Sequence, residues 1–233
     1  MSKPMYLTFP NLILKDGLTD IKKCMSDAMS YCLFYQFILY QNSPNPKESA
    51  SNYLGITFPD IEKSLKRGAY LHESIYKKAP KTSISKEMIF DFYKNKKTEF
   101  EVVCFLAFAS LKSMIQRQVY KKITNDYLLS RMSGNSKKNG EINPKLKKYA
   151  GRYQLDKIKI ELQLNWGLKY YAEMTRGFYV SFKMPLSSLA LIAEKNKKAY
   201  KLKLLKRQKQ EATKNAIEQL SKKSNFEFKN QDK

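Results

Sequence analysis

The stretch from residue 121 to residue 183 contains KITNDYLLSRMSG (122–134), IKIELQLNWGL (158–168) and KYYAEMTRGFYVSF (169–182), and it decides the fold. The first pattern predicts a short capped helix, the second the end of a longer basic helix, and the third a hairpin of two strands. One class of nucleic-acid-binding modules has the same order of elements. It consists of a supporting helix, a helix that lies on the duplex, and a hairpin that reaches the adjacent nucleic-acid backbone. The order of the patterns therefore points to nucleic acid.

The first helix is predicted to begin after Thr124, a good N-cap residue, and to end at Gly134. The second is predicted from about Pro144 to Asn165, with a bend or a restart at Gly151. At 100° per residue, one side of this second helix carries its apolar and small positions, Gly151, Leu155, Ile158 and Leu162. The opposite arc is mostly polar or aromatic and consists of Tyr149, Arg152, Tyr153, Asp156, Lys157, Ile160 and Gln163.

The period changes from helical to alternating after Trp166 and Gly167. Alternation predicts that one face of the second strand is buried, and this face holds Phe178, Val180 and Phe182. The opposite, polar face then holds Tyr179, Ser181 and Lys183. Gly177 suits the turn between the strands, which places Thr175 and Arg176 at the tip of the hairpin.

This segment resembles the winged helix-turn-helix superfamily of DNA-binding proteins, including the duplicated winged-helix initiators of plasmid replication. The matching residues are Ile123-Thr124, Leu128-Leu129, Met132-Gly134, Ile158, Leu162, Gly167-Leu168 and Gly177-Phe178-Tyr179-Val180. They cover about a quarter of the chain, and the whole chain faintly resembles uncharacterised proteins of Bacteroidetes mobile elements. The resemblance implies DNA contacts from the second helix and the hairpin tip, namely Arg152, Tyr153, Lys157, Lys159, Thr175 and Arg176. Lys148, which precedes these helix positions, is a further candidate.

Charge supports a polyanionic partner. The chain has 44 Lys and Arg against 21 Asp and Glu, a formal net charge of +23 and an isoelectric point of about 9.7. Such a charge attracts nucleic acid, because each neutralised phosphate releases counterions. The net charge is +4 over residues 1–94, +11 over 95–193 and +8 over 194–233. In the last segment we expect phosphate contacts from Lys198, Lys201, Lys206 and Arg207, although a charge run is most often only solvated.

A membrane partner is not expected. The longest strongly apolar stretch, from Val102 to Leu111, is about half as long as a spanning helix. The N-terminus has no cleavage-like small-residue site, so a cytoplasmic location is predicted. An acidic membrane surface is the rival polyanion, because a basic C-terminal helix could lie on one.

Enzymatic activity, metals and cofactors are not expected either. The three cysteines, Cys24, Cys32 and Cys104, are predicted to be reduced core residues. His72 is the only histidine, and no nucleophile and base can be assembled around it. The acidic pairs at Asp60 and Glu62 and at Glu99 and Glu101 are typical of the first turn of a helix.

The predicted fold is mostly α with a small β-hairpin. A helical N-terminal domain (1–94) is expected to contain a core helix over Leu18–Gln41, more deeply buried toward its end. A winged-helix domain (95–185) follows, and residues 186–233 are predicted to form a basic C-terminal helix with a frayed tail. A coiled-coil homodimer through this helix is a minor possibility, because its apolar positions do not sustain heptads.

Two functions are compatible with these features. The first is sequence-recognising binding of double-stranded DNA, as a replication initiator or a transcriptional regulator of a mobile element. The alternative is a non-catalytic interaction protein with a solvated basic face, such as a phage-type inhibitor or an RNA-binding accessory subunit of a nucleoprotein complex.

Overall fold

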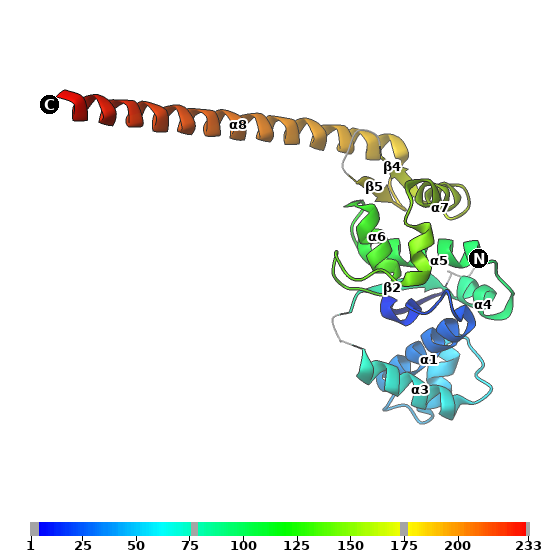
Figure 1. Cartoon of the computed structure of the whole chain (residues 1–233). Coiled ribbons are helices and arrows are strands. Elements are labelled where there is room, and N and C mark those ends of the chain that lie inside the picture. The colour runs from blue at the N-terminus through cyan, green and yellow to red at the C-terminus, as the bar shows by residue number, and fades with distance from the viewer. Residues whose placement is uncertain (1–4, 76–78, 173–176, 232–233) are drawn as a thin grey trace.

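The computed structural model describes residues 5–75, 79–172 and 177–231, with side chains up to residue 220. The described part is mostly helical and contains two small antiparallel sheets. A compact body is followed by one long helix, α8 (Leu186–Gln231), which projects away from it (Figure 1). The helix continues to Gln231, through residues where a frayed tail is expected from the sequence.

The N-terminal part combines helices with a two-stranded sheet. Its elements are β1 (Tyr6–Pro10), the 3-10 helix η1 (Asn11–Leu14), α1 (Ile21–Leu39), α2 (Pro46–Leu54), α3 (Ile61–Ser74), β2 (Lys81–Ser85) and α4 (Lys86–Lys94). β1 and β2 pair antiparallel, with Thr8 opposite Ser83. The prediction of an entirely helical segment over residues 1–94 is therefore wrong for these strands, which pair residues 75 positions apart.

Helix starts follow local capping, as the sequence predicts. In α5 (Glu99–Ile115), the Thr98 side chain accepts a hydrogen bond from the backbone N–H of Glu101, and the Glu101 carboxylate accepts one from the N–H of Thr98. Asp60, Ser85 and Thr124 likewise accept backbone hydrogen bonds at the starts of their helices. Each cap satisfies an N–H group that has no partner inside the helix.

The end of α1 is less buried than the sequence predicts. Phe34 and Phe37 pack partly against the core. Tyr35, Ile38 and Leu39, in the same last turns, are exposed. Burial therefore decreases along α1, from the mostly buried turns over residues 24–33 to half-buried and exposed side chains in its last turns.

The second half of the body contains a three-stranded sheet. After α5 come β3 (Lys121–Ile123), α6 (Asn125–Met132), the 3-10 helix η2 (Pro144–Tyr149), α7 (Arg152–Asn165), β4 (Lys169–Tyr171) and β5 (Phe178–Ser181). The strands lie in the order β3-β5-β4, and both pairs are antiparallel. The expected pairing of the two strands after Gly167 is thus confirmed.

The helix predicted from Pro144 to Asn165 is two helices. A 3-10 helix ends before Ala150, and Gly151 takes an extended conformation (φ −62°, ψ 144°) from which α7 begins at Arg152. Of the two possibilities for Gly151, a restart is therefore the one observed. The apolar side of α7 is confirmed at Leu155, Ile158 and Leu162, which are buried.

β5 is buried on both faces, although its sequence alternates. Phe178 and Val180 pack in the main core as predicted, but Tyr179 and Ser181 are buried too. The expectation that these two face solvent is wrong. Leu189 and Ala193 of α8 pack on Tyr179, and the Ser181 hydroxyl donates a hydrogen bond of 2.7 Å to the Val119 carbonyl. Gly177 takes a positive φ of 88°, and a side chain there would meet the Ile123 carbonyl.

One cluster of buried side chains extends from β1 through α1 and α5 to α7 and β5. The division into domains at residues 94 and 185 stays a prediction. Cys24, Cys32 and Cys104 are buried free cysteines, as expected, and burial raises the pKa of each thiol to about 12. Among the described residues, no helix is both long and apolar enough to cross a membrane.

Candidate nucleic-acid interface

The outer face of α7 presents three of the predicted contact residues. Arg152, Tyr153 and Lys157 are exposed, and the Lys157 ammonium lies 4.6 Å from the centre of the Tyr153 ring. The Arg152 Nε atom lies 3.8 Å from a carboxylate oxygen of Asp156, one turn along the helix. Because Arg152 is 93% exposed, this contact leaves its guanidinium accessible to a phosphate or a base edge.

Lys159 is placed differently from its prediction. Its side chain is only 4% exposed, its ammonium donates a hydrogen bond of 2.9 Å to Asp156, and it lies 4.5 Å from the centre of the Phe178 ring. Phe178, the first residue of β5, lies against this side of α7, so the inner arc of the helix includes Lys159 as well as its apolar residues. Lys159 is a structural residue here, and its assignment as an outward DNA contact is corrected.

Lys148 lies in η2, outside α7. Its ammonium forms a 2.6 Å ion pair with Glu99 at the start of α5, and this hydrogen bond holds the pKa of the Glu99 carboxyl below its ordinary value. Both side chains are exposed, so the pair contributes little to stability. Lys148 therefore meets a carboxylate of its own chain, unlike Lys157. Thr175 and Arg176 lie outside the described residues.

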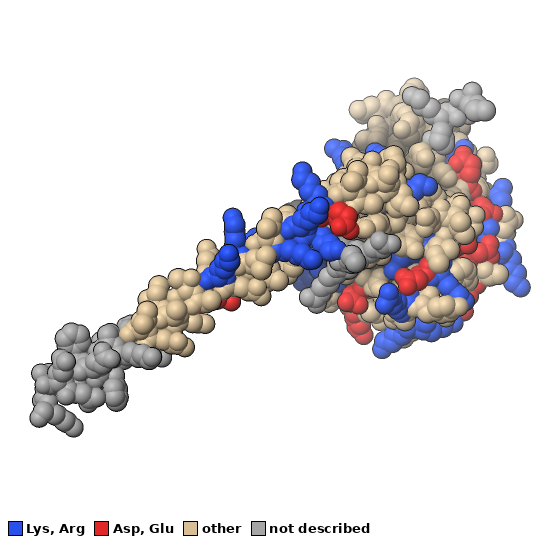
Figure 2. Space-filling model, turned by 90° about the horizontal axis from the view of Figure 1, so that it is seen from above, with Lys and Arg blue, Asp and Glu red and all other residues tan. Residues whose placement is uncertain are grey.

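The four candidate contacts in α8 are exposed on the projecting part of the helix: Lys198, Lys201, Lys206 and Arg207. Between Glu194 and Glu211 the sequence has no carboxylate. At 100° per residue, the four cations point to different sides of the helix rather than to one face. Figure 2 shows Lys and Arg side chains gathered along the part of α8 nearest the body.

The first turns of α8 attach the helix to the three-stranded sheet. Leu189 and Ala193 are buried against Tyr179 of β5. The Tyr171 hydroxyl of β4 donates a hydrogen bond of 3.0 Å to the Glu194 carboxylate. The first turns of α8 are therefore held against the three-stranded sheet, and the cations begin directly after them.

Two features of the surface are missing from the sequence-based candidates. The first is an apolar stripe on α7, where Ile160 and Leu164 are 48% and 74% exposed. The second is the exposed face of the β1–β2 sheet, beside which Lys112, Arg117 and Lys121 lie. The alternation in YLTFP and KTSIS is the signal that could have predicted this face, because Leu7 is buried between the exposed Tyr6 and Thr8, and Thr82 is buried between the exposed Lys81 and Ser83.

No group of three or more His, Cys, Asp and Glu side chains suited to a metal ion occurs in the described part of the chain. Compared with protein-family models, with curated proteins and with solved structures, the chain matches none.

Proposed function

We propose that the chain is a sequence-recognising protein that binds double-stranded DNA through a winged helix-turn-helix formed by residues 99–181. The observation that carries this proposal is the succession α5, β3, α6, α7, β4 and β5, with the strands arranged as β3-β5-β4. In such a module the first two helices support the third, which lies in the major groove, and the hairpin reaches the adjacent backbone.

In this proposal α7 is the recognition helix. The Arg152 guanidinium can donate two hydrogen bonds to a guanine edge, and Lys157 can contact a base or a phosphate. Ile160 and Leu164 can contact thymine methyl groups further along the groove. Asp156 repels phosphate, and its bonds to Arg152 and Lys159 reduce that repulsion. The hairpin tip with Thr175 and Arg176 stays a predicted wing contact.

α8 supplies sequence-independent affinity. Its cations occur on all sides of the helix, which suits a partner with phosphates on more than one side, such as a nucleic-acid groove, better than a flat membrane surface. Phosphate contacts position a protein on DNA without reading its sequence. We therefore assign sequence recognition to α7 and general affinity to α8, without a catalytic role or a cofactor.

Within this class we propose a replication initiator or a transcriptional regulator of a mobile element, as the resemblance described above implies. The second candidate is a non-catalytic interaction protein, and the exposed apolar side chains of α7 favour it. Tyr153, Ile160 and Leu164 recur at spacings of seven and four residues along one stripe, a pattern that also suits docking on another protein.

Selection of binding sites from random duplexes tests the proposal. The wild-type chain is expected to enrich one sequence, and Arg152→Ala with Lys157→Ala should reduce affinity for it by about 1–3 kcal/mol for each side chain that contacts a base. Lys63→Ala with Lys66→Ala on α3 removes two exposed charges elsewhere and should leave the enriched site unchanged. Failure to enrich any duplex, together with capture only by a protein complex, would favour the second candidate.

A further inference from the structure

The β1–β2 sheet has one polar, exposed face. Tyr6 and Thr8 of β1 and Lys81 and Ser83 of β2 lie on it, whereas Leu7, Phe9 and Ile84 point into the core. The hydroxyls of Thr8 and Ser83 lie 2.7 Å apart across the two strands. Two adjoining hollows, of about 530 and 770 Å³, border this sheet and share Tyr6, Thr8 and Lys81. The second lies on the polar face, whereas the first also reaches Leu7 and the buried Cys32 at the side of β1 that faces α1.

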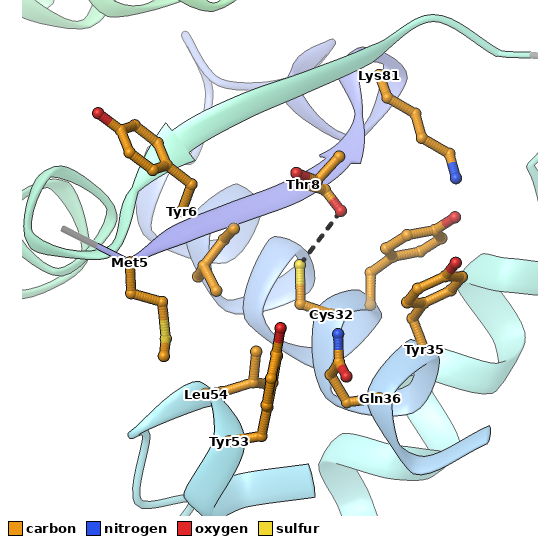
Figure 3. A pocket seen from close by; sticks show the side chains of 11 residues that line it. Met5, Tyr6, Thr8, Cys32, Tyr35, Gln36, Tyr53, Leu54 and Lys81 are labelled. Atoms are coloured by element: carbon orange, nitrogen blue, oxygen red, sulfur yellow. Dashed lines mark hydrogen bonds between the residues drawn. The ribbon is translucent and has the colours of Figure 1, made fainter. Parts of the chain in front are cut away.

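Tyrosines line the first hollow, which lies between the sheet and helices α1 and α2. Tyr35 and Gln36 come from α1, Tyr53 comes from α2, and Thr8 and Lys81 come from the sheet (Figure 3). Tyr35 and Tyr53 are 42% and 52% exposed, so their rings are accessible to a ligand. The Lys81 ammonium lies 5.4 Å from the centre of the Tyr35 ring, which places a cation beside an aromatic surface.

Cations line the second hollow, on the other side of the shared residues. Besides Lys81 they are Lys112 in the last turn of α5, Arg117 in the segment after it, and Lys121, the first residue of β3. Lys112 is half-buried, and desolvation lowers its pKa below the ordinary value. Arg117 is exposed. The residue before it, Gln116, has a positive φ of 48°, a conformation that costs energy for a residue with a side chain.

Charge complementarity defines the kind of ligand. Among the described residues that line the two hollows, four are cations and none is a carboxylate. On α7, by contrast, Arg152 lies beside Asp156, and Lys148 next to α7 is paired with Glu99. The first hollow offers accessible aromatic rings, and it continues into a second hollow whose described lining residues include cations and no carboxylate. This combination suits a polymer that carries both flat rings and phosphates.

We propose that this groove binds single-stranded DNA, with one or two bases against Tyr35 and Tyr53 and the phosphates along Lys81 and Arg117. A duplex cannot use the groove in this way, because its bases are stacked inside and do not reach the tyrosines. The inference goes beyond the proposed function, since it adds a second site, and none of the described residues that line it belongs to α7. Only the choice of DNA over RNA rests on the proposed function.

The test uses the full-length chain and two labelled probes of equal length, an oligothymidylate and an abasic strand with the same phosphates. α8 binds both probes alike through phosphate, so the preference for the probe with bases isolates stacking. Anisotropy should show that wild type prefers oligothymidylate by on the order of ten-fold for each stacked base. Tyr35→Ala with Tyr53→Ala should abolish the preference, whereas the corresponding Phe variants should keep it.

Three controls separate this site from the others. Tyr70→Ala removes an exposed tyrosine of α3 outside the groove and should change nothing. Lys81→Gln with Arg117→Gln should weaken both probes and reduce the salt dependence. Binding of the duplex site should fall in the Arg152 and Lys157 variants but not in the tyrosine variants, so failure of one site is distinguishable from failure of the other.

A folded Tyr35→Ala, Tyr53→Ala chain that still prefers bases overturns the groove assignment. Equal binding of the two probes by wild type overturns it as well. If an oligouridylate binds more tightly than the oligothymidylate, the choice of DNA over RNA is overturned. If an acidic peptide displaces the probe and unlabelled oligothymidylate does not, the partner is a protein and the groove assignment to nucleic acid is overturned.

Discussion

Lys159 tests whether α7 is packed as described. Its side chain has two partners, the Asp156 carboxylate at 2.9 Å and the Phe178 ring at 4.5 Å, and it is 4% exposed. Lys159→Ala removes three buried methylene groups, each contributing about 0.8 kcal/mol to the free energy of unfolding. The lost interaction with the Phe178 ring adds about 0.5–1 kcal/mol. The freed Asp156 carboxylate is 44% exposed and stays solvated, so the ion pair adds little.

The expected total loss for Lys159→Ala is about 3 kcal/mol. Lys159→Met is the matched control, because methionine retains most of the apolar stem and fills the same space. Its cost should stay below about 1.5 kcal/mol. Urea unfolding followed by circular dichroism measures both variants, and the gap of roughly 1.5–2 kcal/mol between them is the quantity of interest.

If Lys159 instead faced solvent and contacted phosphate, both variants would unfold like wild type. Both would also lose duplex affinity, with a shallower salt dependence. That combination of results would refute the packing of α7 against β5 described here.

Three further predictions concern other parts of the chain. Truncation after Glu194 keeps the contacts of α8 with the sheet and removes its cations. Affinity for all duplexes should therefore fall alike, and the slope of log affinity against log salt concentration should flatten by up to about 0.9 per lost phosphate contact. A changed sequence preference would contradict the assignment of general affinity to α8. Gly68→Ala makes the new methyl group clash with the Ser30 carbonyl oxygen, where α3 meets α1, and should lower the free energy of unfolding by about 1–3 kcal/mol. Gly151→Ala is the matched control and should cost far less, because the space around Gly151 is open. Burial raises the pKa of each of the three cysteine thiols to about 12, so all three stay protonated at pH 8. A thiol reagent should therefore modify them only after unfolding. Rapid labelling of the folded chain would show instead that they are accessible.

Features that depend only on neighbouring residues could be predicted from the sequence. Helix starts at Asp60, Ser85, Thr98 and Thr124 were predictable because each cap bonds to a backbone group three residues ahead. The buried stripe of α7 followed from helical periodicity, and the positive φ of Gly177 from the conformational freedom of glycine. These relations are local and do not require knowledge of the rest of the fold.

Only the tertiary structure decided what covers each face. Periodicity indicates which residues share one face of a helix or strand, but a second layer can cover the polar face too. The packing of α8 over Tyr179 is an example. Lys159 points inward because β5 approaches α7, and its long stem can be buried while its charge reaches Asp156. The groove on the β1–β2 sheet required the pairing of strands 75 positions apart and the approach of α1, α2 and the end of α5. Such contacts join distant segments, so no window of the sequence contains both partners.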